Sequence, residues 1–371
     1  MIPEIIYINL IILLTLYFVF NVSVVLGWFK ISKSTNYEKA KLISFSILIP
    51  MRNEEDKIEN LLKDIINQNY KTENFEIIVI DDHSTDQSFE LVKNLNIDNL
   101  ILIKNSGEGK KSAIEIGLQK AKNEYIVQTD SDCGMGKNWL LSINNYLNSH
   151  SVKLLIAPVV FNPKNKFFSA LQELDFMALM MSTAGLTNLN HPIMANGANL
   201  IYPKAVINRN NILNSKTSSG DDVFLLHYIK KEYGAKSIHF IKSKEASVTT
   251  TPTSSLSEFL NQRIRWASKS KYYKDLDTIA VGSLVFLINI TLLISFFAAF
   301  FSETNKHLFL VFFLSKFFAD YLLLLPILSF YKRTALLIYI PILSFIYPFY
   351  ISFVAIVSPF KSFVWKDRKY K

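Results

Sequence analysis

Residues 75–86 read Phe-Glu-Ile-Ile-Val-Ile-Asp-Asp-His-Ser-Thr-Asp, an apolar run that ends in three carboxylates. A short apolar run followed by polar residues is typical of a buried strand that ends in a loop. Residues 125–132, which read Tyr-Ile-Val-Gln-Thr-Asp-Ser-Asp, repeat this pattern further along the chain. Because parallel sheets bind ligands beyond the carboxyl ends of their strands, the two acidic strand ends predict a binding site.

Strand and helix patterns alternate along residues 43–160. Apolar residues recur with helical spacing from Ile58 to Ile66, for example, between two short apolar runs. This alternation predicts an α/β fold, with a parallel sheet covered by helices on both faces. We expect strands at 44–49, 75–80, 100–103, 125–129 and 154–160, and helices at 58–66, 87–95, 114–121, 167–181 and 257–269.

Charged residues are missing from three long stretches of the chain. Of the 371 residues, 50% are hydrophobic and only 19% are charged, and no charge lies between Glu4 and Lys30, Asp277 and Glu303, or Arg333 and Lys361. Each stretch reaches the ~20 residues that cross a ~30 Å hydrocarbon core. This composition excludes a fully soluble or a disordered protein. We expect an N-terminal membrane anchor at 1–30 and about three hydrophobic segments at 278–360.

The positive charges gather beside these apolar stretches. The formal net charge is +9, and many Lys and Arg residues follow the first stretch or lie in a basic tail at 361–371. This is the positive-inside pattern, which predicts an integral protein of the inner (cytoplasmic) membrane with its large domain in the cytoplasm. A nucleic-acid partner would need the charges on one domain face. The single cysteine, Cys133, excludes an internal disulfide and is expected to be a small packed residue.

Two features of the membrane segments stay open. Lys316 and Asp320 lie four residues apart in a hydrophobic segment, where they would form a salt bridge or contribute to acceptor binding. Three full crossings after the large domain would place the basic tail outside, whereas the positive-inside rule places it inside. Pro341 and Pro348 could break the last segment into a re-entrant hairpin or an interfacial helix.

Three acidic turns and one helix are the candidate functional segments. A carboxylate of Asp81-Asp82 could accept the imide N–H of a uracil-type base, and Asp130-x-Asp132 could share a divalent cation. Gly220-Asp221-Asp222 forms a third acidic turn. Each turn also has a simpler explanation, because Asp, Ser and Thr cap helices. Gln262-x-x-Arg265-Trp266 places three side chains on one helical face, unless this is only a basic helix at the membrane surface.

The order of these motifs resembles the membrane-bound family 2 glycosyltransferases, whose catalytic domains have the GT-A fold. The resemblance is carried by Ile49-Pro50-x-Arg52-Asn53-Glu54-Glu55, Asp81-Asp82-x-Ser84-Thr85-Asp86, Gly109-Lys110-x-x-Ala113-Ile114, Asp130-x-Asp132, Gly220-Asp221-Asp222 and Gln262-x-x-Arg265-Trp266. It implies a GT-A domain at 43–270 that includes an interfacial helix at 254–270, with flanking transmembrane helices. Two positions depart from the family pattern: Glu115 stands where Asn is usual, and Asp221 where Glu commonly precedes the base.

The resemblance also implies a role for each matching residue. Asp222 would be the general base, and Asp130 and Asp132 would hold a Mg²⁺ or Mn²⁺ ion. Residues implied in donor binding are Pro50, Arg52, Glu54, Asp81, Asp82, Lys110, Asp130 and Ser131. Residues implied at the diphosphate and the acceptor are Asp221, Gln262, Arg265 and Trp266.

The function implied is transfer, with inversion, of a hexosyl or N-acetylhexosaminyl group from a nucleotide sugar, expected to be UDP-linked. The acceptor would be a lipid or lipid-linked glycan at the cytoplasmic membrane face. A processive polysaccharide synthase is the alternative, because such synthases share the Gln-x-x-Arg-Trp sequence, although few spans leave little wall for a polymer channel. A non-catalytic nucleotide-binding scaffold would be expected to lack the base or the acidic pair, and both are present here.

Overall fold

The computed structural model describes residues 2–32, 41–162, 166–207, 221–361, 363–365 and 368–370. Several residues of the predicted motifs and basic runs, namely Lys33, Lys39, Gly220, Lys366 and Lys371, lie outside this part of the chain. The helices are α1 (Ile2–Lys30), α2 (Ile58–Ile66), α3 (Ser88–Asn94), α4 (Gly109–Lys120), α5 (Trp139–Ser149), α6 (Phe167–Asn188), α8 (Asp221–Tyr233), α9 (Leu256–Ala267), α10 (Leu276–Ala298), α11 (Glu303–Phe330) and α12 (Ile340–Val357). The strands are β1 (Phe45–Met51), β2 (Phe75–Asp81), β3 (Leu100–Lys104), β4 (Tyr125–Gln128), β5 (Gly134–Met135), β6 (Leu154–Ile156), β7 (Val159–Phe161), β8 (Leu200–Pro203), β9 (Ile238–Phe240), β10 (Val248–Thr250), β11 (Phe363–Trp365) and β12 (Arg368–Tyr370).

The main sheet has the strand order β3-β2-β1-β4-β8-β6-β9. β1 is parallel to β2 and β4, with Phe45 opposite both Phe75 and Tyr125. β8, by contrast, is antiparallel to β4 and β6. The predicted parallel sheet is therefore mixed, because the chain enters β8 from the carboxyl edge of β4, where Leu200 lies opposite Gln128. This entry brings the turn before β8 to the edge where the acidic strand ends lie.

The strand predicted at 154–160 is wrong as a single element. β6 belongs to the main sheet, whereas β7 pairs with β10 in a second sheet ordered β5-β10-β7. Pro158 lies between them and has no N–H to continue a ladder, but its carbonyl accepts a hydrogen bond from Val248 N at 3.0 Å. The break at Pro158 therefore lets the consecutive strands β6 and β7 belong to two different sheets.

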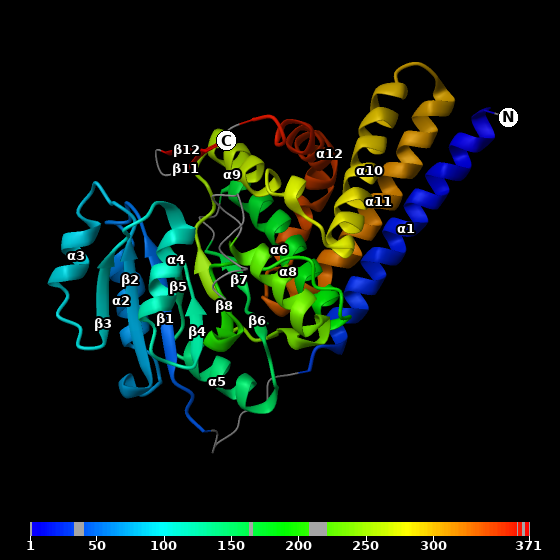
Figure 1. The fold of residues 1–371 in the computed structure, drawn as a ribbon. Helices are drawn as coiled ribbons and strands as arrows, with labels where there is room; N and C mark the ends of the chain where they lie inside the picture. The colour runs from blue at the N-terminus through cyan, green and yellow to red at the C-terminus, as the bar shows by residue number, and fades with distance from the viewer. Residues whose placement is uncertain are drawn as a thin grey trace.

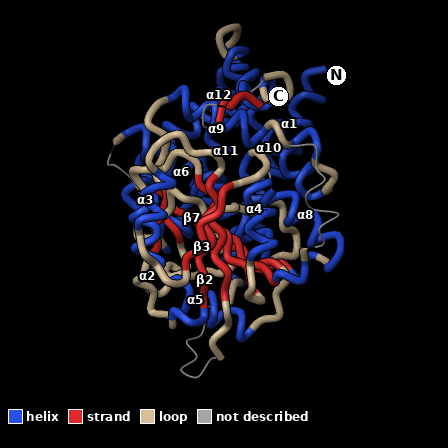
Figure 2. Tube along the Cα trace, turned by 60° about the vertical axis from the view of Figure 1, so that its left-hand side comes forward, coloured by secondary structure: helices blue, strands red, loops and turns tan. Residues whose placement is uncertain are grey.

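Helices flank the strands of the central sheet, as Figure 2 shows. The predicted apolar stripe of α2 is buried, with Ile58, Leu61, Leu62 and Ile65 inaccessible to solvent. α4 packs against β1 and β2 at Gly117, where a Cβ atom would lie 2.9 Å from Ile80 Cδ1. Glycine at this position lets α4 lie close to the sheet, which positions the first turn of α4 over the strand ends.

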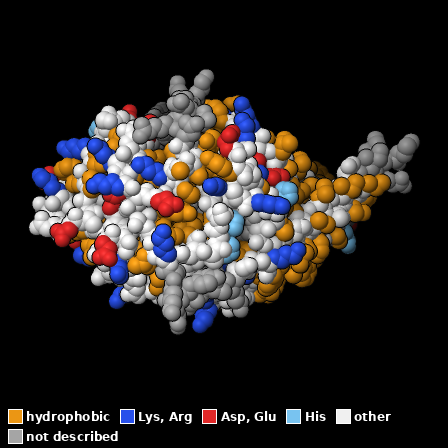
Figure 3. Space-filling model, turned by 60° about the horizontal axis from the view of Figure 1, so that its bottom comes forward, with side chains coloured by type: hydrophobic (Ala, Val, Ile, Leu, Met, Phe, Trp, Pro, Cys, Tyr) orange, Lys and Arg blue, Asp and Glu red, His pale blue; other side chains and the backbone are white. Residues whose placement is uncertain are grey.

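Four helices are long and apolar enough to cross a membrane: Tyr7–Lys30, Leu276–Ala298, Glu303–Phe330 and Thr334–Val357. α1, α10 and α11 lie side by side and project away from the sheet (Figure 1). Hydrophobic side chains cover the projecting part, whereas charged side chains gather over the sheet domain (Figure 3). The structure thus separates an apolar arm from a polar domain.

α12 lies between α9 and the α10–α11 pair (Figure 1). Its residues form one helix with Pro341 in the first turn, where an N–H is not needed, and Pro348 inside the helix. The re-entrant hairpin considered from the sequence is therefore absent from residues 340–357. After α12, β11 pairs with β12, and β11 lies against α9, at the same end of the molecule as the sheet domain.

α6 joins the membrane arm to the sheet domain. It runs beyond the predicted helix at 167–181 and crosses α1, where a Cβ atom on Gly27 or on Gly185 would overlap the facing backbone. Small residues of this kind let two helix backbones approach closely. Asn188 Nδ2 also donates a hydrogen bond to Gly27 O at 3.0 Å. The arm is therefore fixed to the domain by backbone contact.

The predicted salt bridge in the membrane segment is confirmed. Lys316 Nζ donates to Asp320 Oδ2 at 2.6 Å, and Ser344 Oγ donates to the same oxygen at 3.0 Å. Tyr17 Oη donates to Asp320 Oδ1 at 2.6 Å. We call these four residues the intramembrane cluster. It joins α1, α11 and α12, and it pairs the charges that would otherwise be costly in lipid.

Candidate active site

The second and third acidic turns meet around Lys110 of α4. Lys110 Nζ donates to Asp130 Oδ1 at 2.5 Å, at the end of β4. Burial lowers the pKa of Lys110, but the charges of Asp130, Asp221 and Asp222 outweigh it, so the pKa is raised and the ammonium stays charged. With Asp132, which completes the Asp-x-Asp pair, these carboxylates are called the site carboxylates below.

The first acidic turn positions Lys110 through Asp82. Asp82 Oδ1 accepts hydrogen bonds from Gly109 N at 2.9 Å and from Asn105 Nδ2 at 2.8 Å. A carboxylate is favourable here, because the first N–H groups of a helix lack partners within it. Gly109 has φ 86°, in the left-handed region that favours glycine. Asp82 therefore caps a helix from a neighbouring strand end and does not cap the helix that follows it.

Arg52 holds the backbone of the first turn. Its Nη1 donates to Asp82 O at 2.7 Å and to His83 O at 2.8 Å. The carboxylate of Asp81 accepts from Ser84 N, with the shorter distance at 3.3 Å. Asp81 and Asp82 are both buried. The turn is thus rigid, and Asp86 supplies the local cap by accepting from Ser88 N at 3.0 Å.

The neighbouring residues of β1 tie this turn to the sheet. Pro50 lies in β1 opposite Ile80 of β2. Glu54 is buried, its backbone N donates to Ser88 Oγ at 2.7 Å, and its carboxylate lies 3.6 Å from Lys57 Nζ. Both residues therefore border the first acidic turn.

The Asp130-x-Asp132 pair follows β4. Asp132 Oδ2 accepts from Thr250 Oγ1 at 3.2 Å and lies 3.9 Å from Lys57 Nζ. Ser131 between them is buried, and so is Cys133, as predicted. Burial raises the pKa of the Cys133 thiol, and the charges of Asp132 and Asp130 raise it further, so the thiol stays neutral.

A hard divalent cation suits this pair. Within the described residues no group of three or more His, Cys, Asp and Glu side chains could hold a metal ion. Mg²⁺-type ions are commonly bound by one or two carboxylates plus water and substrate phosphate oxygens. Asp130 and Asp132 supply two such carboxylates, and the remaining positions would be filled by a phosphate-bearing ligand and water.

The third acidic turn begins α8. Asp221 Oδ2 accepts from Gln128 Nε2 at 2.9 Å. Asp222 accepts from Val223 N at 2.8 Å and Gly197 N at 3.2 Å. Burial would raise the pKa of Asp222, but Lys269, Lys110 and these amide hydrogen bonds outweigh it and lower the pKa. The carboxylate is therefore ionised at neutral pH and able to accept a proton.

The turn containing Gly197 lies inside the site. A Cβ atom on Gly197 would lie 2.9 Å from Gln128 Nε2, 3.3 Å from Lys110 Nζ and 3.5 Å from Asp221 Oδ2. The structure places this turn against three polar site residues, and a larger side chain at Gly197 would push them apart.

α9 brings a second, partly buried cation, Arg265, to the carboxylates. Burial lowers the pKa of Arg265, although Asp130, Asp222, Asp221 and Asp132 all act in the opposite direction. The four carboxylates therefore act on the Arg265 guanidinium together. Arg265 stands where a negatively charged ligand among the carboxylates would meet it.

Gln262 and Trp266 lie differently from each other. Gln262 Oε1 is buried and lacks a hydrogen-bond partner in the part of the chain that is described. The ring of Trp266 packs over Arg263, with Cζ 4.4 Å from the ring centroid, and faces Phe176 of α6 at 6.3 Å. Trp266 directly follows Arg265, so the two side chains point about 100° apart around α9, and the Trp266 ring lies on the side of Arg263 and α6.

Three further residues belong to the site that were not predicted from the sequence: Lys269, Gln128 and Tyr273. Lys269 is buried, with Nζ 3.8 Å from Asp222 Oδ1. It follows Arg265 by four residues, a helical spacing that could have indicated it. Gln128 ends β4, beside the acidic pair. Tyr273 lies near enough to Asp222 that burial and this charge raise its pKa, but no sequence signal indicates it.

Residues 46–209 match the family model described as Glycosyl transferase family 2. The poly(ribitol-phosphate) beta-N-acetylglucosaminyltransferase TarS of Staphylococcus aureus is 30% identical over 119 residues, which cover 31% of this chain and 21% of TarS. TarP of the same species, described by the same activity, is 25% identical over 247 residues, covering 62% of this chain and 74% of TarP. The chain spans about a fifth of the length of the first curated relatives it matches.

A solved structure shows the same fold. The mannosyltransferase PcManGT from Pyrobaculum calidifontis, in complex with GDP-Man and Mn²⁺, aligns with a TM-score of 0.59 at 18% sequence identity. The alignment covers 91% of this chain and 97% of PcManGT. The predicted α/β fold of the GT-A type is confirmed, with flanking helices able to span a membrane.

Proposed function

We propose that the chain transfers a sugar from a nucleotide-sugar donor, since residues 46–209 match the family 2 glycosyltransferases. One observation carries the proposal: two acidic turns and two cations meet at one edge of the sheet, where Lys110 contacts Asp130 and Lys269 lies 3.8 Å from Asp222. TarS and TarP are N-acetylglucosaminyltransferases, and PcManGT is a mannosyltransferase. We therefore propose that the transferred group is a hexosyl or N-acetylhexosaminyl group.

Departure of the nucleoside diphosphate is the step that needs positive charge. Lys110 and Arg265 are partly buried cations near the site carboxylates, so they would meet the diphosphate oxygens and stabilise their growing charge. A Mg²⁺ or Mn²⁺ ion held by Asp130 and Asp132 would supply further charge neutralisation when bound. Lys110 would exchange its bond to Asp130 for one to the donor.

Attack by the acceptor hydroxyl requires a base. Asp222 is ionised, and within the described residues its carboxylate accepts two amide hydrogen bonds and lies 3.8 Å from Lys269 Nζ. It would take the hydroxyl proton as the new bond forms. A base on the face opposite the leaving group implies direct displacement, and hence inversion at the anomeric carbon.

The nucleoside would bind along the first acidic turn. The rigid turn held by Arg52 borders the start of α4, and Asp81 and Asp82 lie in it. A base and ribose placed there would leave the diphosphate beside Lys110. We propose a UDP-linked donor, with Pro50, Glu54 and Ser131 as further contacts, and Asp221 and Gln262 toward the diphosphate and acceptor.

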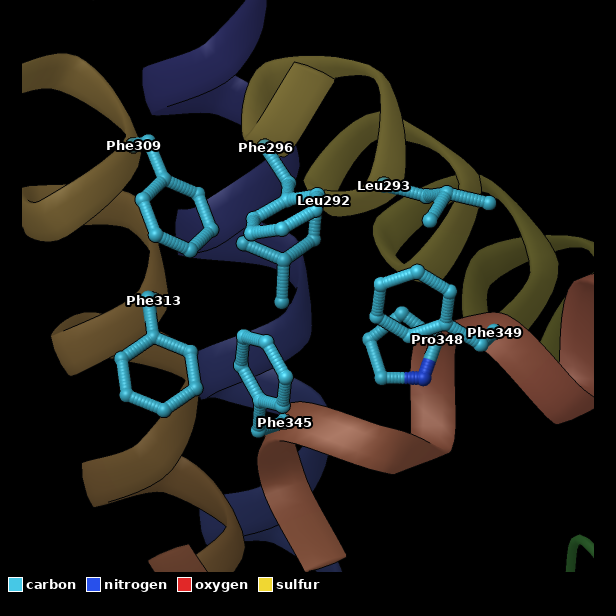
Figure 4. Close-up of a pocket in the computed structure, with 8 residues that line it drawn as sticks. All are labelled: Leu292, Leu293, Phe296, Phe309, Phe313, Phe345, Pro348 and Phe349. Carbon is cyan, nitrogen blue, oxygen red and sulfur yellow. The ribbon is translucent and has the colours of Figure 1, made fainter. Parts of the chain in front are cut away.

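Single transfer to a lipid or lipid-linked acceptor is proposed over polymer export. A small hollow between α10, α11 and α12 lies among Phe296, Phe309, Phe313 and Phe345 (Figure 4). Every residue that lines this space is apolar. A glycan passing between these helices would leave its hydroxyl groups without hydrogen-bond partners, which is costly. An acceptor that stays at the membrane surface avoids this cost.

The sheet domain is proposed to face the cytoplasm, with the chain integral to the inner membrane. Support comes from β11, which lies against α9 and so keeps the tail at the end of the molecule that bears the sheet. Tail and domain on one side agree with the positive-inside rule. In sealed inside-out vesicles, added protease would then cleave both the tail and the sheet domain.

The proposal is tested by turnover of the purified chain in detergent with UDP- and GDP-sugars and Mn²⁺. Release of the nucleoside diphosphate is expected with at least one donor, and it should stop on chelation of the metal and in Asp130→Ala. Donor binding without any release, with or without added membrane lipid, would instead identify a nucleotide-binding scaffold. Product length from a radiolabelled donor separates single transfer from processive synthesis.

A further inference from the structure

Arg263 of α9 is held by two other helices. Its Nη2 lies 2.5 Å from Asp175 Oδ2 in α6, and the hydroxyl of Tyr350 in α12 donates to Asp175 Oδ1 at 2.7 Å. Arg263 and Asp175 are 6% and 3% exposed. The rings of Phe259 and Trp266 cover the guanidinium, at 4.8 and 4.4 Å from Cζ. We call Asp175, Arg263 and Tyr350 the α9 clamp.

The geometry of a helix links Arg263 to Arg265. Residues two positions apart point about 200° apart around the axis, so the two side chains leave α9 on nearly opposite sides. Asp175 holds Arg263 on the side of α6 and α12. Arg265 consequently projects to the side of Lys269, four residues further on, whose Nζ lies 3.8 Å from Asp222 Oδ1.

The helix that supplies Asp175 is itself anchored. Glu173 of α6 is 1% exposed and accepts two hydrogen bonds from Arg333, from Nε and Nη2, both at 2.8 Å. Such a two-point contact fixes direction as well as distance. Arg333 follows α11, so α6 is fixed to the membrane arm close to the point where it meets α9.

We infer that the α9 clamp is a positioning device that couples membrane helix α12 to the active site. The inference rests on the proposed function, in which Arg265 meets the leaving diphosphate. Asp175, Arg263 and Tyr350 set the rotation of α9 and so hold Arg265 in its place. Because a misplacement of about 1 Å can cost ~10²-fold in rate, the sheet domain depends on α12 for full activity.

The choice of variant separates positioning from stability. Replacing Asp175 would leave Arg263 buried without a counter-charge, which is strongly destabilising. Tyr350→Phe removes only one hydroxyl and keeps the ring that packs on Phe259. Tyr17→Phe is a matched control, because the Tyr17 hydroxyl donates to Asp320 at 2.6 Å beside Lys316, in the intramembrane cluster. Both variants lose a tyrosine–carboxylate hydrogen bond next to an ion pair.

The main test is a double-mutant cycle between Tyr350 and Arg265. Tyr350→Phe should lower kcat about tenfold with the donor KM changed less than about twofold, whereas Tyr17→Phe should stay near the parent kcat. In an Arg265→Lys background, Tyr350→Phe should lower kcat less than about twofold further. The guanidinium that Tyr350 helps to position is already absent in this background. Equal falls in both backgrounds, or the same fall in Tyr17→Phe, would overturn the inference.

A second measurement works without turnover. Amide hydrogen exchange in residues 256–267 of the full chain in detergent should be faster in Tyr350→Phe than in the parent, and unchanged in Tyr17→Phe. Unchanged exchange in Tyr350→Phe would overturn the inference. Faster exchange in a chain that turns over no nucleotide sugar would reject the proposed function but retain the coupling of α12 to α9.

Discussion

Lys110 and Lys316 each contact an aspartate, at 2.5 Å from Asp130 and 2.6 Å from Asp320, but the two pairs have different surroundings. In the intramembrane cluster, one cation faces one carboxylate, and the side chain of Lys316 is 2% exposed. At the strand ends, Lys110 belongs to a larger group, and the Asp130 side chain is 35% exposed. The Lys316–Asp320 pair is therefore closed to solvent, whereas the Lys110–Asp130 pair is open to it.

The access of solvent to the carboxylates explains the difference. Four described cations, Lys57, Lys110, Arg265 and Lys269, lie near the four site carboxylates, and the side chains of Asp130 and Asp132 are still 35% and 30% exposed. Their oxygen atoms can therefore accept a divalent cation, to which a diphosphate would also bind. Asp320 instead accepts three hydrogen bonds and has its charge matched by Lys316. A buried and fully paired carboxylate stabilises a structure, whereas partly exposed carboxylates can bind a ligand.

The largest effect is expected from Asp222→Asn. The amide keeps the shape of the side chain but cannot take a proton, so kcat should fall by ~10²–10⁴-fold. The donor dissociation constant, measured by calorimetry, should change little, and Asp98→Asn at an exposed position should behave like the parent. Near-normal turnover in Asp222→Asn would assign the base to another residue. It would also weaken the contrast between the site carboxylates and the intramembrane cluster.

Lys316→Met tests the closed pair. It leaves a buried carboxylate without its cation, which should cost about 3–5 kcal/mol of unfolding free energy in denaturant titrations. The double variant Lys316→Met/Asp320→Leu should recover most of this loss, because no unpaired charge remains. Activity per folded molecule should match the parent in both variants. A loss of activity without a loss of stability would instead give this cluster a role in acceptor binding.

Lys110→Met makes the same change in the open group. Asp130 can be hydrated after the change, so the free energy of unfolding should move by less than about 1 kcal/mol. Donor affinity should fall about tenfold, because a charged hydrogen bond to the diphosphate is lost. Equilibrium binding and unfolding are measured on the same preparation. A large stability loss with unchanged affinity would show that Lys110 is structural.

The smallest effect is expected from Lys269→Met. Lys269 lowers the pKa of Asp222, so its removal should raise this pKa toward the ordinary range. Asp222 then becomes protonated at a higher pH as the solution is acidified. The acid limb of the kcat/KM profile should therefore move to higher pH, with little change on the plateau near neutral pH. An unmoved acid limb would separate Lys269 from the base.

Much of the fold was predictable because its signals are local. The apolar spacing of α2 and the strand at Phe75 both follow from residues close in sequence. The direction of β8 was not predictable, since it depends on where α6 and the following turn return the chain. The break at Pro158 had a local signal that was overlooked, because proline interrupts a ladder.

The candidate site was predictable in its residue types but not in their partners. Asp82 stood at a strand end in the sequence, yet its role as the cap of α4 needed the neighbouring strand. Lys269 and Gln128 meet Asp222 and Asp221 only because α9 and β4 converge on α8. Contacts of this kind join segments far apart in the chain, where periodicity carries no information.

From its sequence alone this chain has an alternating α/β domain, apolar membrane segments and carboxylates at strand ends, because hydrophobic spacing and turn chemistry act over a few residues. The three-dimensional packing decided which cation meets which carboxylate, that Trp266 turns to α6, and that Arg263 is held by Asp175 and Tyr350. These outcomes depend on how α6, α9 and α12 pack against one another, and such packing exists only after distant parts of the chain come together.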